Sequence, residues 1–414
     1  MTPTKIEIIK TAITSPYWLI LALGGAFFSF FALNRGGVVV FIELGTFFLL
    51  LNFITRDYHI KRIPLNLWAT AAICVYLILS GYLVSSQQPH TKSIIYTLRM
   101  LSIVFIIHCL SRKKMHAHID KLIPIIISIA VCWQFVTFYF WSMTYGTFTN
   151  PHFLSNFLML VIPLIVYYFV CSPARYKVIF VLIGIMAADL LLHTGSRPAI
   201  LGLILAALFV LALLTKSRLK WIGISLVFLL LIMLYITDYA QIYTKIKHLI
   251  FNLGADERVP IWIISVRMLK DNSFLNWIFG NGIGSFRLTY PQYAASGYHF
   301  SNFSKLKAQK IKNLVSPHFF PFELLYENGL IGMFLVSGGL AYLLIAAIQA
   351  EKNANHKTGS ILIKCMLVVF LSWLFHSNLT FPFYSKYTQY SLGFILGTML
   401  VILEKSNGQS KEEM

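Results

Sequence analysis

Residues 177–215 read KVIFVLIGIMAADLLLHTGSRPAILGLILAALFVLALLT, and this stretch decides the fold. It contains two apolar runs, 177–195 and 198–215, and each is close to the roughly 20 residues that an α-helix needs to cross a bilayer. The runs meet at Gly195-Ser196-Arg197-Pro198, a group of residues that is typical of turns. We therefore expect two membrane-spanning helices joined by a very short turn.

Similar apolar runs fill most of the 414 residues. The chain is 57% hydrophobic and 12% charged, with a mean hydropathy of +0.72, whereas a soluble domain carries about 25% charged residues. This composition predicts an all-α polytopic membrane protein with about twelve transmembrane helices. The expected spans are 17–34, 37–54, 64–85, 94–110, 121–141, 152–171, 177–195, 198–215, 220–237, 325–350, 360–378 and 388–404.

The net charge of +19 reflects membrane topology rather than binding of nucleic acid. Basic residues form short clusters between the spans, and no RNP, zinc-finger or helix-turn-helix signal accompanies them. With an even number of spans, most Lys and Arg of the short loops fall on the side that also holds both termini. The short loops of the opposite side hold only Arg35, Lys92, Arg197 and Lys386. The positive-inside rule therefore predicts that both termini are cytoplasmic.

These spans divide the chain into four parts. We expect nine helices in 1–237, a large periplasmic loop in 238–320, three helices in 321–406 and a polar cytoplasmic tail in 407–414. Long loops that lack structure are uncommon in compact proteins, so this loop should fold.

Within the loop, 260–269 has the pattern of an amphipathic helix that starts near Asp256 and Pro260. A second short apolar segment, 274–279, leads into the glycine-rich turn 280–284. The loop is therefore expected to contain short helices.

Charged residues inside the spans need a partner or a function. Arg99 lies in the fourth span, Glu43 in the second and Asp189 in the seventh. Arg99 could pair with either acid, and the sequence does not choose between them. Lys364 is close enough to one end of its span to reach the membrane surface.

Three arginines are candidate ligands for an anion on the periplasmic face. Arg197 begins a helix, where exposed backbone N–H groups favour anions, although an interfacial Arg can also serve only to reach lipid head groups. Arg258 and Arg287 lie in the long loop, where solvated surface charge is the ordinary interpretation. The planar fork of arginine suits phosphate oxygens. Together, if the fold brings them close, they predict a pyrophosphate site.

His318 stands just before the tenth span, at the mouth of a transmembrane helix. An imidazole can accept a proton near neutral pH, as a general base must, although a histidine at an interface is more often structural. Glu323 and Glu327 lie one helical turn apart. They could orient this base, or they could cap the helix start and face water.

Motifs for other chemistry are missing from the sequence. It has no Walker A loop, no HExxH and no EF-hand pattern, so neither a metal nor a cofactor is expected. No cytoplasmic segment is long enough to bind a nucleotide-sugar. A glycosyltransferase built this way would use a lipid-linked donor on the outer face.

Four segments, in order, resemble the bacterial O-antigen ligases and their polymerase relatives, a GT-C-like superfamily. Residues 146–152 are similar to the family's outer turn before a helix, and 196–202 to its Ser-Arg-x-x-x-Leu segment. Arg258 with Trp262 and then 280–284 are similar to its loop helix and glycine turn. His318 with 323–332 is similar to its His-containing helix start. The family often has Asn after the histidine, where this chain has Phe319.

The resemblance implies a metal-independent, inverting glycosyltransferase of the bacterial inner membrane. Such ligases move a glycan from undecaprenyl pyrophosphate to lipid A-core at the periplasmic face. By the same resemblance, His318 would be the catalytic base, Arg197 and Arg258 would bind pyrophosphate, and Arg287 would be a third ligand.

Three other functions remain open at this point. A polymerase of the same superfamily would use the same donor but a lipid-linked glycan as acceptor. A protein O-oligosaccharyltransferase would be expected to carry an added C-terminal domain. A lipid or glycan transporter would show paired repeats and broken helices, which the sequence does not have. The glycan, the acceptor hydroxyl and the oligomeric state are not encoded in any recognisable pattern.

Overall fold

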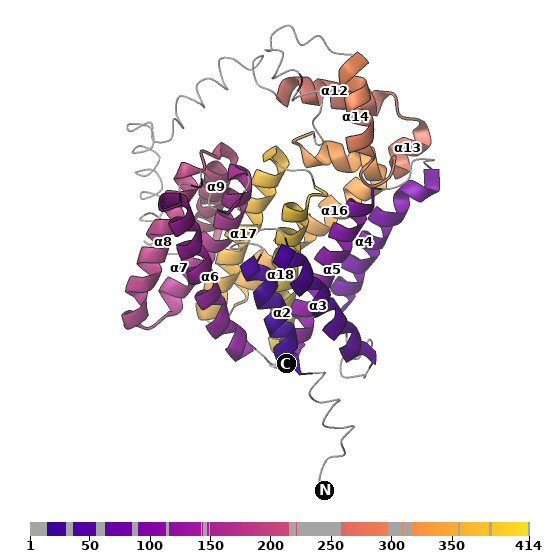
Figure 1. Ribbon diagram of the computed structural model, residues 1–414. Helices are drawn as coiled ribbons and strands as arrows, with labels where there is room; N and C mark the ends of the chain where they lie inside the picture. Colours follow the sequence, from indigo (N-terminus) through magenta and orange to yellow (C-terminus); the bar gives the residue numbers. More distant parts are fainter. Residues whose placement is uncertain are drawn as a thin grey trace.

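The chain is a bundle of long helices with three shorter helices packed at one end (Figure 1). In this computed structural model the described residues are 15–29, 36–54, 63–84, 90–112, 116–141, 143, 147–148, 150–214, 221, 258–296, 309, 317–354, 357–380 and 383–412. Every element within them is an α-helix. The predicted fold class, an all-helical membrane protein, is confirmed at this level.

Eleven of the predicted spans correspond to helices. They are α2 (Pro16–Phe28), α3 (Gly36–Ile54), α4 (Leu65–Val84), α5 (Thr91–Arg112), α6 (His116–Tyr139), α7 (Pro151–Cys171), α8 (Ala174–His193), α9 (Arg197–Leu214), α16 (Phe320–Lys352), α17 (Lys357–Thr380) and α18 (Lys386–Glu412). The predicted span 220–237 lies outside the described residues except for residue 221. Helix α18 continues to Glu412, so most of the predicted tail 407–414 is an extension of this helix.

Within the described residues, seven helices are long and apolar enough to cross a membrane. They are Thr91–Arg112, Lys121–Tyr139, Pro151–Cys171, Ala174–His193, Arg197–Leu214, Phe320–Lys352 and Thr358–Thr380. Three shorter apolar helices are Pro16–Ala26, Val39–Asn52 and Leu65–Ser80. The protein is therefore a multi-pass membrane protein, and the total of twelve spans stays a prediction.

The two predicted helices at the centre of 177–215 are present with the expected short turn. Helix α8 ends at His193 and α9 begins at Arg197. Gly195 adopts a positive φ of 61°, a conformation that favours glycine. Arg197 thus occupies the first position of α9, where unpaired backbone N–H groups are concentrated.

Small residues allow the longest helices to pack closely. Gly393 and Gly397 of α18 face α5, where an added Cβ would lie 3.0 Å from the Met100 carbonyl oxygen and 2.8 Å from Ile107 Cδ1, respectively. Gly202 of α9 lies against the Ser372 carbonyl of α17 in the same way. Close approach through small residues is the usual basis of helix association in membranes.

Arg99, the arginine inside a span, pairs with one of its two predicted partners. Arg99 donates to Glu43 through Nε at 3.0 Å and through Nη2 at 2.7 Å, and its Nη1 donates to Tyr390 at 3.3 Å. The alternative acid, Asp189, accepts instead from the Tyr139 hydroxyl at 2.6 Å. Lys364 pairs with Glu351 at 3.0 Å.

The three shorter helices are α12 (Arg258–Lys270), α13 (Phe274–Phe279) and α14 (Ser285–Ser296). Together with the first turns of α16 they form a second hydrophobic core, which includes Ile261, Ile264, Phe286, Tyr290 and Tyr326. The predicted loop helix near 260–269 and the segment 274–279 are confirmed as α12 and α13. We call this end of the bundle the loop end (top of Figure 1), and the opposite end, where the chain finishes, the terminal end.

Candidate functional site

A cluster of histidine and serine side chains joins α7, α9 and α17 at the loop end. His152 Nδ1 lies 3.2 Å from Ser196 Oγ. His376 Nε2 lies 3.4 Å from the same oxygen and 3.3 Å from Ser155 Oγ. We call these four residues, His152, Ser155, Ser196 and His376, the histidine cluster. Ser155, Ser196 and His376 are buried, so the cluster fixes three helix ends to one another.

Local sequence explains why these side chains point at one another. Asn150 caps α7 by accepting a hydrogen bond from the His152 backbone N–H at 2.8 Å, and Pro151 fits the first helical position. Thr194 Oγ1 accepts from the Ser196 N–H at 3.2 Å. These contacts hold His152 in the first turn of α7 and Ser196 immediately before α9.

Two of the predicted site residues meet this cluster. Arg258, the first residue of α12, is close enough to His152 and His376 to act on both electrostatically. His318 acts on His152 in the same way. Arg197 follows Ser196 directly in the chain. The segments that carry Ser196, Arg258 and His318, each about 60 residues from the next in sequence, are therefore brought to one place.

The imidazole of His318 is held in a defined orientation. Its Nδ1 lies 2.8 Å from the Thr380 carbonyl oxygen at the end of α17. A carbonyl can only accept, so Nδ1 carries the proton, and Nε2 of the neutral ring is left as the basic nitrogen. The residue has a φ of 49°, a left-handed conformation that non-glycine residues rarely adopt outside functional or strained sites.

Helix α12 packs directly against the His318 segment. Trp262 donates its indole N–H to the Pro317 carbonyl at 3.0 Å. Its ring also contacts Phe319 edge to face, with centroids 6.3 Å apart. Phe319, which stands where the family often has Asn, therefore packs on α12. The same helix contains both Arg258 and Trp262.

Glu327 fastens the glycine turn 280–284 to α16. Its Oε2 accepts from the Gly284 N–H at 2.6 Å and its Oε1 from the Phe286 N–H at 3.1 Å. Gly280 approaches so closely that a Cβ would lie 2.2 Å from the Glu327 carbonyl oxygen, and its φ is 85°. The turn thus positions α14 against the first turns of α16.

Glu323 binds backbone in a similar manner, with its Oε2 accepting from the Phe383 N–H at 2.6 Å. The side chains of Glu323 and Glu327 are only 3% and 1% exposed. The interpretation that they cap the helix start and face water is therefore wrong. Their described hydrogen bonds go to backbone amides, whereas the contact that orients His318 is the Thr380 carbonyl.

Arg287 lies in a different part of the loop end. It is exposed on α14 and acts electrostatically on His90, which precedes α5. Burial lowers the pKa of His90, and the positive charges of Arg287 and Lys92 lower it further. The His90 N–H also donates to the Ile283 carbonyl at 2.9 Å. Arg287 thus belongs to a second basic group beside α5.

Sequence reasoning assigned no role to His376. It lies near the end of the predicted span 360–378, and the one available signal was that ionisable residues inside spans are functional by default. His152 was noticed only as part of a motif. Among the described residues, no group of three His, Cys, Asp or Glu side chains could hold a metal ion.

The arrangement combines cationic forks with a fixed imidazole at one end of a membrane bundle. Such a site can bind an anionic group and accept a proton from a neighbouring hydroxyl.

Comparison with known proteins is consistent with this chemistry. No curated protein matches the chain. Residues 182–337, however, match the family model described as O-Antigen ligase, and this stretch includes Arg197, Arg258, Arg287 and His318. This match, over 156 of the 414 residues, supports assignment to the O-antigen ligase family and a membrane glycosyltransferase of the ligase or polymerase type.

Proposed function

We propose that this protein transfers a glycan from undecaprenyl pyrophosphate to lipid A-core at the periplasmic face of the bacterial inner membrane. The observation that carries the proposal is the meeting of Arg258 and His318 at the histidine cluster, next to Arg197. The distribution of basic residues supports a periplasmic position for the loop end. Residues 238–320 would then form the periplasmic loop, with the helices of 1–237 and 321–406 around it and 407–414 on the cytoplasmic side.

His318 would act as the catalytic base. The acceptor hydroxyl oxygen attacks the anomeric carbon of the donor sugar, and its proton passes to His318 Nε2. The bond between that carbon and the pyrophosphate oxygen breaks at the same time. A single displacement of this kind inverts the anomeric configuration. The Thr380 carbonyl keeps Nδ1 protonated, so Nε2 is the basic nitrogen of the neutral ring.

Arg197 and Arg258 would bind the leaving pyrophosphate. Negative charge grows on the leaving oxygen as the bond breaks, and preorganised cations stabilise that charge more than they stabilise the substrate. Arg197 adds the first N–H groups of α9, which also favour an anion. Two arginines could supply this charge without a divalent metal. Arg287, beside His90, would contact the donor from the α5 side.

Glu323 and Glu327 would contribute by holding the site's backbone. Glu323 fixes the turn at Phe383 that follows α17, and Glu327 fixes the glycine turn before α14. Neither needs to touch the substrate for this role.

An assay with purified protein tests the proposal. The donor is undecaprenyl-pyrophosphate-linked glycan, and the acceptor is either lipid A-core or a second lipid-linked glycan. We expect a new glycosidic bond to lipid A-core. Elongated glycan on the carrier would instead identify a polymerase, and the absence of any new bond with both acceptors would contradict the proposal.

Substitution of Arg197 tests the assigned role of the cation. Arg197→Ala should lower kcat/KM by about 100- to 1,000-fold, as for loss of one preorganised donor. Arg197→Lys should also be impaired because the planar fork is lost. Arg175→Ala is the matched control, since Arg175 lies at the other end of the α8–α9 pair, over the Tyr176 ring. Equal rates for Arg197→Ala and Arg175→Ala would refute the role.

A further inference from the structure

A cavity of about 680 Å³ lies near the terminal end of the bundle, among α2, α5, α6, α7, α16, α17 and α18. This volume falls within the roughly 300–1,000 Å³ of typical ligand sites. Along α7, the nearest lining residue, Leu160, follows His152 by 8 residues, or about 12 Å of helix. Along α17, Val369 precedes His376 by 7 residues, or about 10 Å. The cavity is therefore separate from the site at the loop end.

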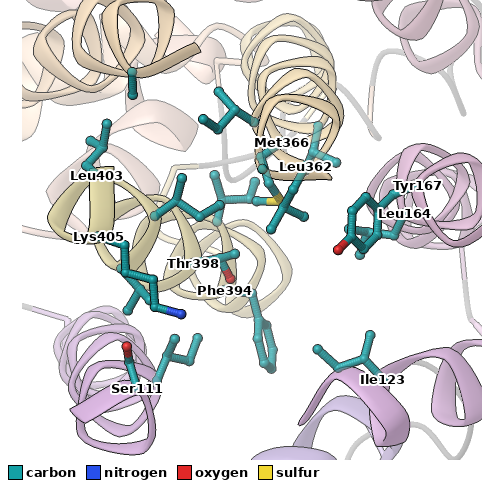
Figure 2. A pocket seen from close by; sticks show the side chains of 18 of the residues that line it. Ser111, Ile123, Leu164, Tyr167, Leu362, Met366, Phe394, Thr398, Leu403 and Lys405 are labelled. Atoms are coloured by element: carbon teal, nitrogen blue, oxygen red, sulfur yellow. The ribbon is translucent and has the colours of Figure 1, made fainter. Parts of the chain in front are cut away.

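The lining of the cavity is mostly apolar, with polar side chains that include Thr398 and Tyr167 as well as Ser111 and Lys405. Figure 2 shows Met366, Phe394 and Leu164 around the space, with the Lys405 amine and the Ser111 hydroxyl along one edge. Among the described residues that line it, Lys405 carries the one formal charge. Nearby Glu404 is hydrogen-bonded to His108 at 3.0 Å and to Arg112. The lining thus suits a molecule with an apolar chain and an anionic end.

We propose that this cavity binds an acyl chain of an anionic glycerophospholipid, with the lipid phosphate beside Lys405 and Ser111. A cation and hydroxyl groups can bind phosphate oxygens, and the many apolar side chains of the lining favour contact with an acyl chain. The described lining offers no carboxylate to pair with the amine of a zwitterionic head group.

A phospholipid fits this site better than the tail of the polyprenyl carrier does. The proposed position of the carrier's pyrophosphate is at the loop end, about 10 Å or more from the nearest lining residue along the helices. A polyprenyl tail that reached the cavity would bring only hydrocarbon to Lys405 and Ser111. A phospholipid brings a chain and a phosphate together, which matches both parts of the lining.

Binding of lipid here would stabilise the bundle. Seven helices meet around the space, and an unfilled space would lose the packing contacts of all their facing side chains. A ligand that binds the folded state alone raises stability in proportion to the logarithm of its concentration.

Glycines on two helices provide a matched pair of variants, one that should fill the cavity and one that should leave it unchanged. A Cβ on Gly359, which lines the cavity, would meet nothing within 4 Å, and the same is true of Gly338 on α16, which is not part of the lining. Gly359→Phe should therefore occupy the cavity, whereas Gly338→Phe adds the same ring elsewhere.

The experiment measures lipid retained by the purified protein with native mass spectrometry. The protein is equilibrated with vesicles of phosphatidylglycerol, of phosphatidylcholine with the same acyl chains, or of phosphatidylcholine containing undecaprenyl phosphate. We expect wild type and Gly338→Phe to retain phosphatidylglycerol preferentially and to gain Tm with it. Gly359→Phe should lose both effects. Equal retention by Gly359→Phe, equal retention of phosphatidylcholine, or preference for undecaprenyl phosphate would each overturn the proposal.

A second pair of variants tests the charge without changing the shape of the cavity. Lys405→Gln should weaken retention of phosphatidylglycerol about five-fold, as expected for one cation beside an anionic head group, and Lys405→Arg should retain it. Lys352→Gln is the control, because Lys352 lies in the last turn of α16 and does not line the cavity. Identical retention by Lys405→Gln and Lys352→Gln would also overturn the proposal.

Discussion

The loop end and the terminal end of the bundle use the same helices for opposite chemistry. At the loop end, α7 and α17 contribute histidines and serines that hydrogen-bond across helix ends, and Arg258 and His318 come close to them. At the terminal end, the same two helices contribute Leu164, Leu362 and Met366 to an apolar cavity. Polar contacts of fixed geometry hold the helices together at the loop end, whereas at the terminal end the side chains of the same helices surround a cavity.

This difference has a physical reason. Polar contacts inside a membrane protein are directional and costly to leave unmade, so the loop end tolerates little change in geometry. A cavity whose lining is mostly apolar has fewer such requirements, so the terminal end should tolerate substitutions that preserve its volume. Mutations at the two ends should therefore differ in kind, and the following predictions test that contrast.

His318 is expected to show the largest effect on activity. Loss of a general base typically lowers the rate about 100- to 10,000-fold, so His318→Ala and His318→Gly should both be nearly inactive. Because His318 has a φ of 49°, the glycine variant should be more stable than the alanine variant by about 1 kcal/mol. Transfer assays and thermal unfolding measure the two effects. Near-normal transfer by either variant would show that the base lies elsewhere.

Replacing a glycine by alanine should lower the stability of the protein at the loop end but not at the terminal end. Gly280→Ala places a Cβ 2.2 Å from the Glu327 carbonyl oxygen at a positive φ, which should lower the free energy of unfolding by about 2–4 kcal/mol. Gly359→Ala meets open space in a helix, so stability should be unchanged or raised by up to about 1 kcal/mol. Thermal unfolding of the two variants in one detergent compares them. Similar losses in both would contradict the contrast between the ends.

The basic group beside α5 should give the smallest effect. Arg287→Ala removes one of the charges that lower the pKa of His90, so this pKa should rise but stay below its ordinary value because burial is the larger cause. The lowered pKa means that stability declines as the pH falls through the window between the ordinary and the lowered value. Arg287→Ala should raise the lower limit of that window and so reduce the total loss of stability, and NMR titration of His90 would measure the rise in its pKa. An unchanged pKa would show that Arg287 does not act on His90.

Much of the fold follows from local patterns in the sequence. Hydropathy identified the helices, and the residues around Gly195 predicted the short turn between α8 and α9. The pattern from Pro260 onward predicted α12. These features depend on about 20 consecutive residues or fewer, so one sequence is enough to predict them.

Features that depend on packing between distant helices could not be predicted in this way. The choice of Glu43 over Asp189 as the partner of Arg99 depends on which helices are neighbours. The partners of Glu323 and Glu327 are backbone amides of other segments, which carry no side-chain signal. His376 gave only the weak signal of one histidine in an apolar run, and the terminal-end cavity gave none.

The most direct test of the account compares two arginines of one helix, α12. Arg258 begins α12 and acts on the histidine cluster, whereas Arg267 is exposed in its last turn. Transfer from undecaprenyl-pyrophosphate-linked glycan should fall by about 100-fold or more in Arg258→Ala and remain at the wild-type rate in Arg267→Ala. Equal rates in the two variants would mean that the arginine brought to the histidine cluster does not bind the donor.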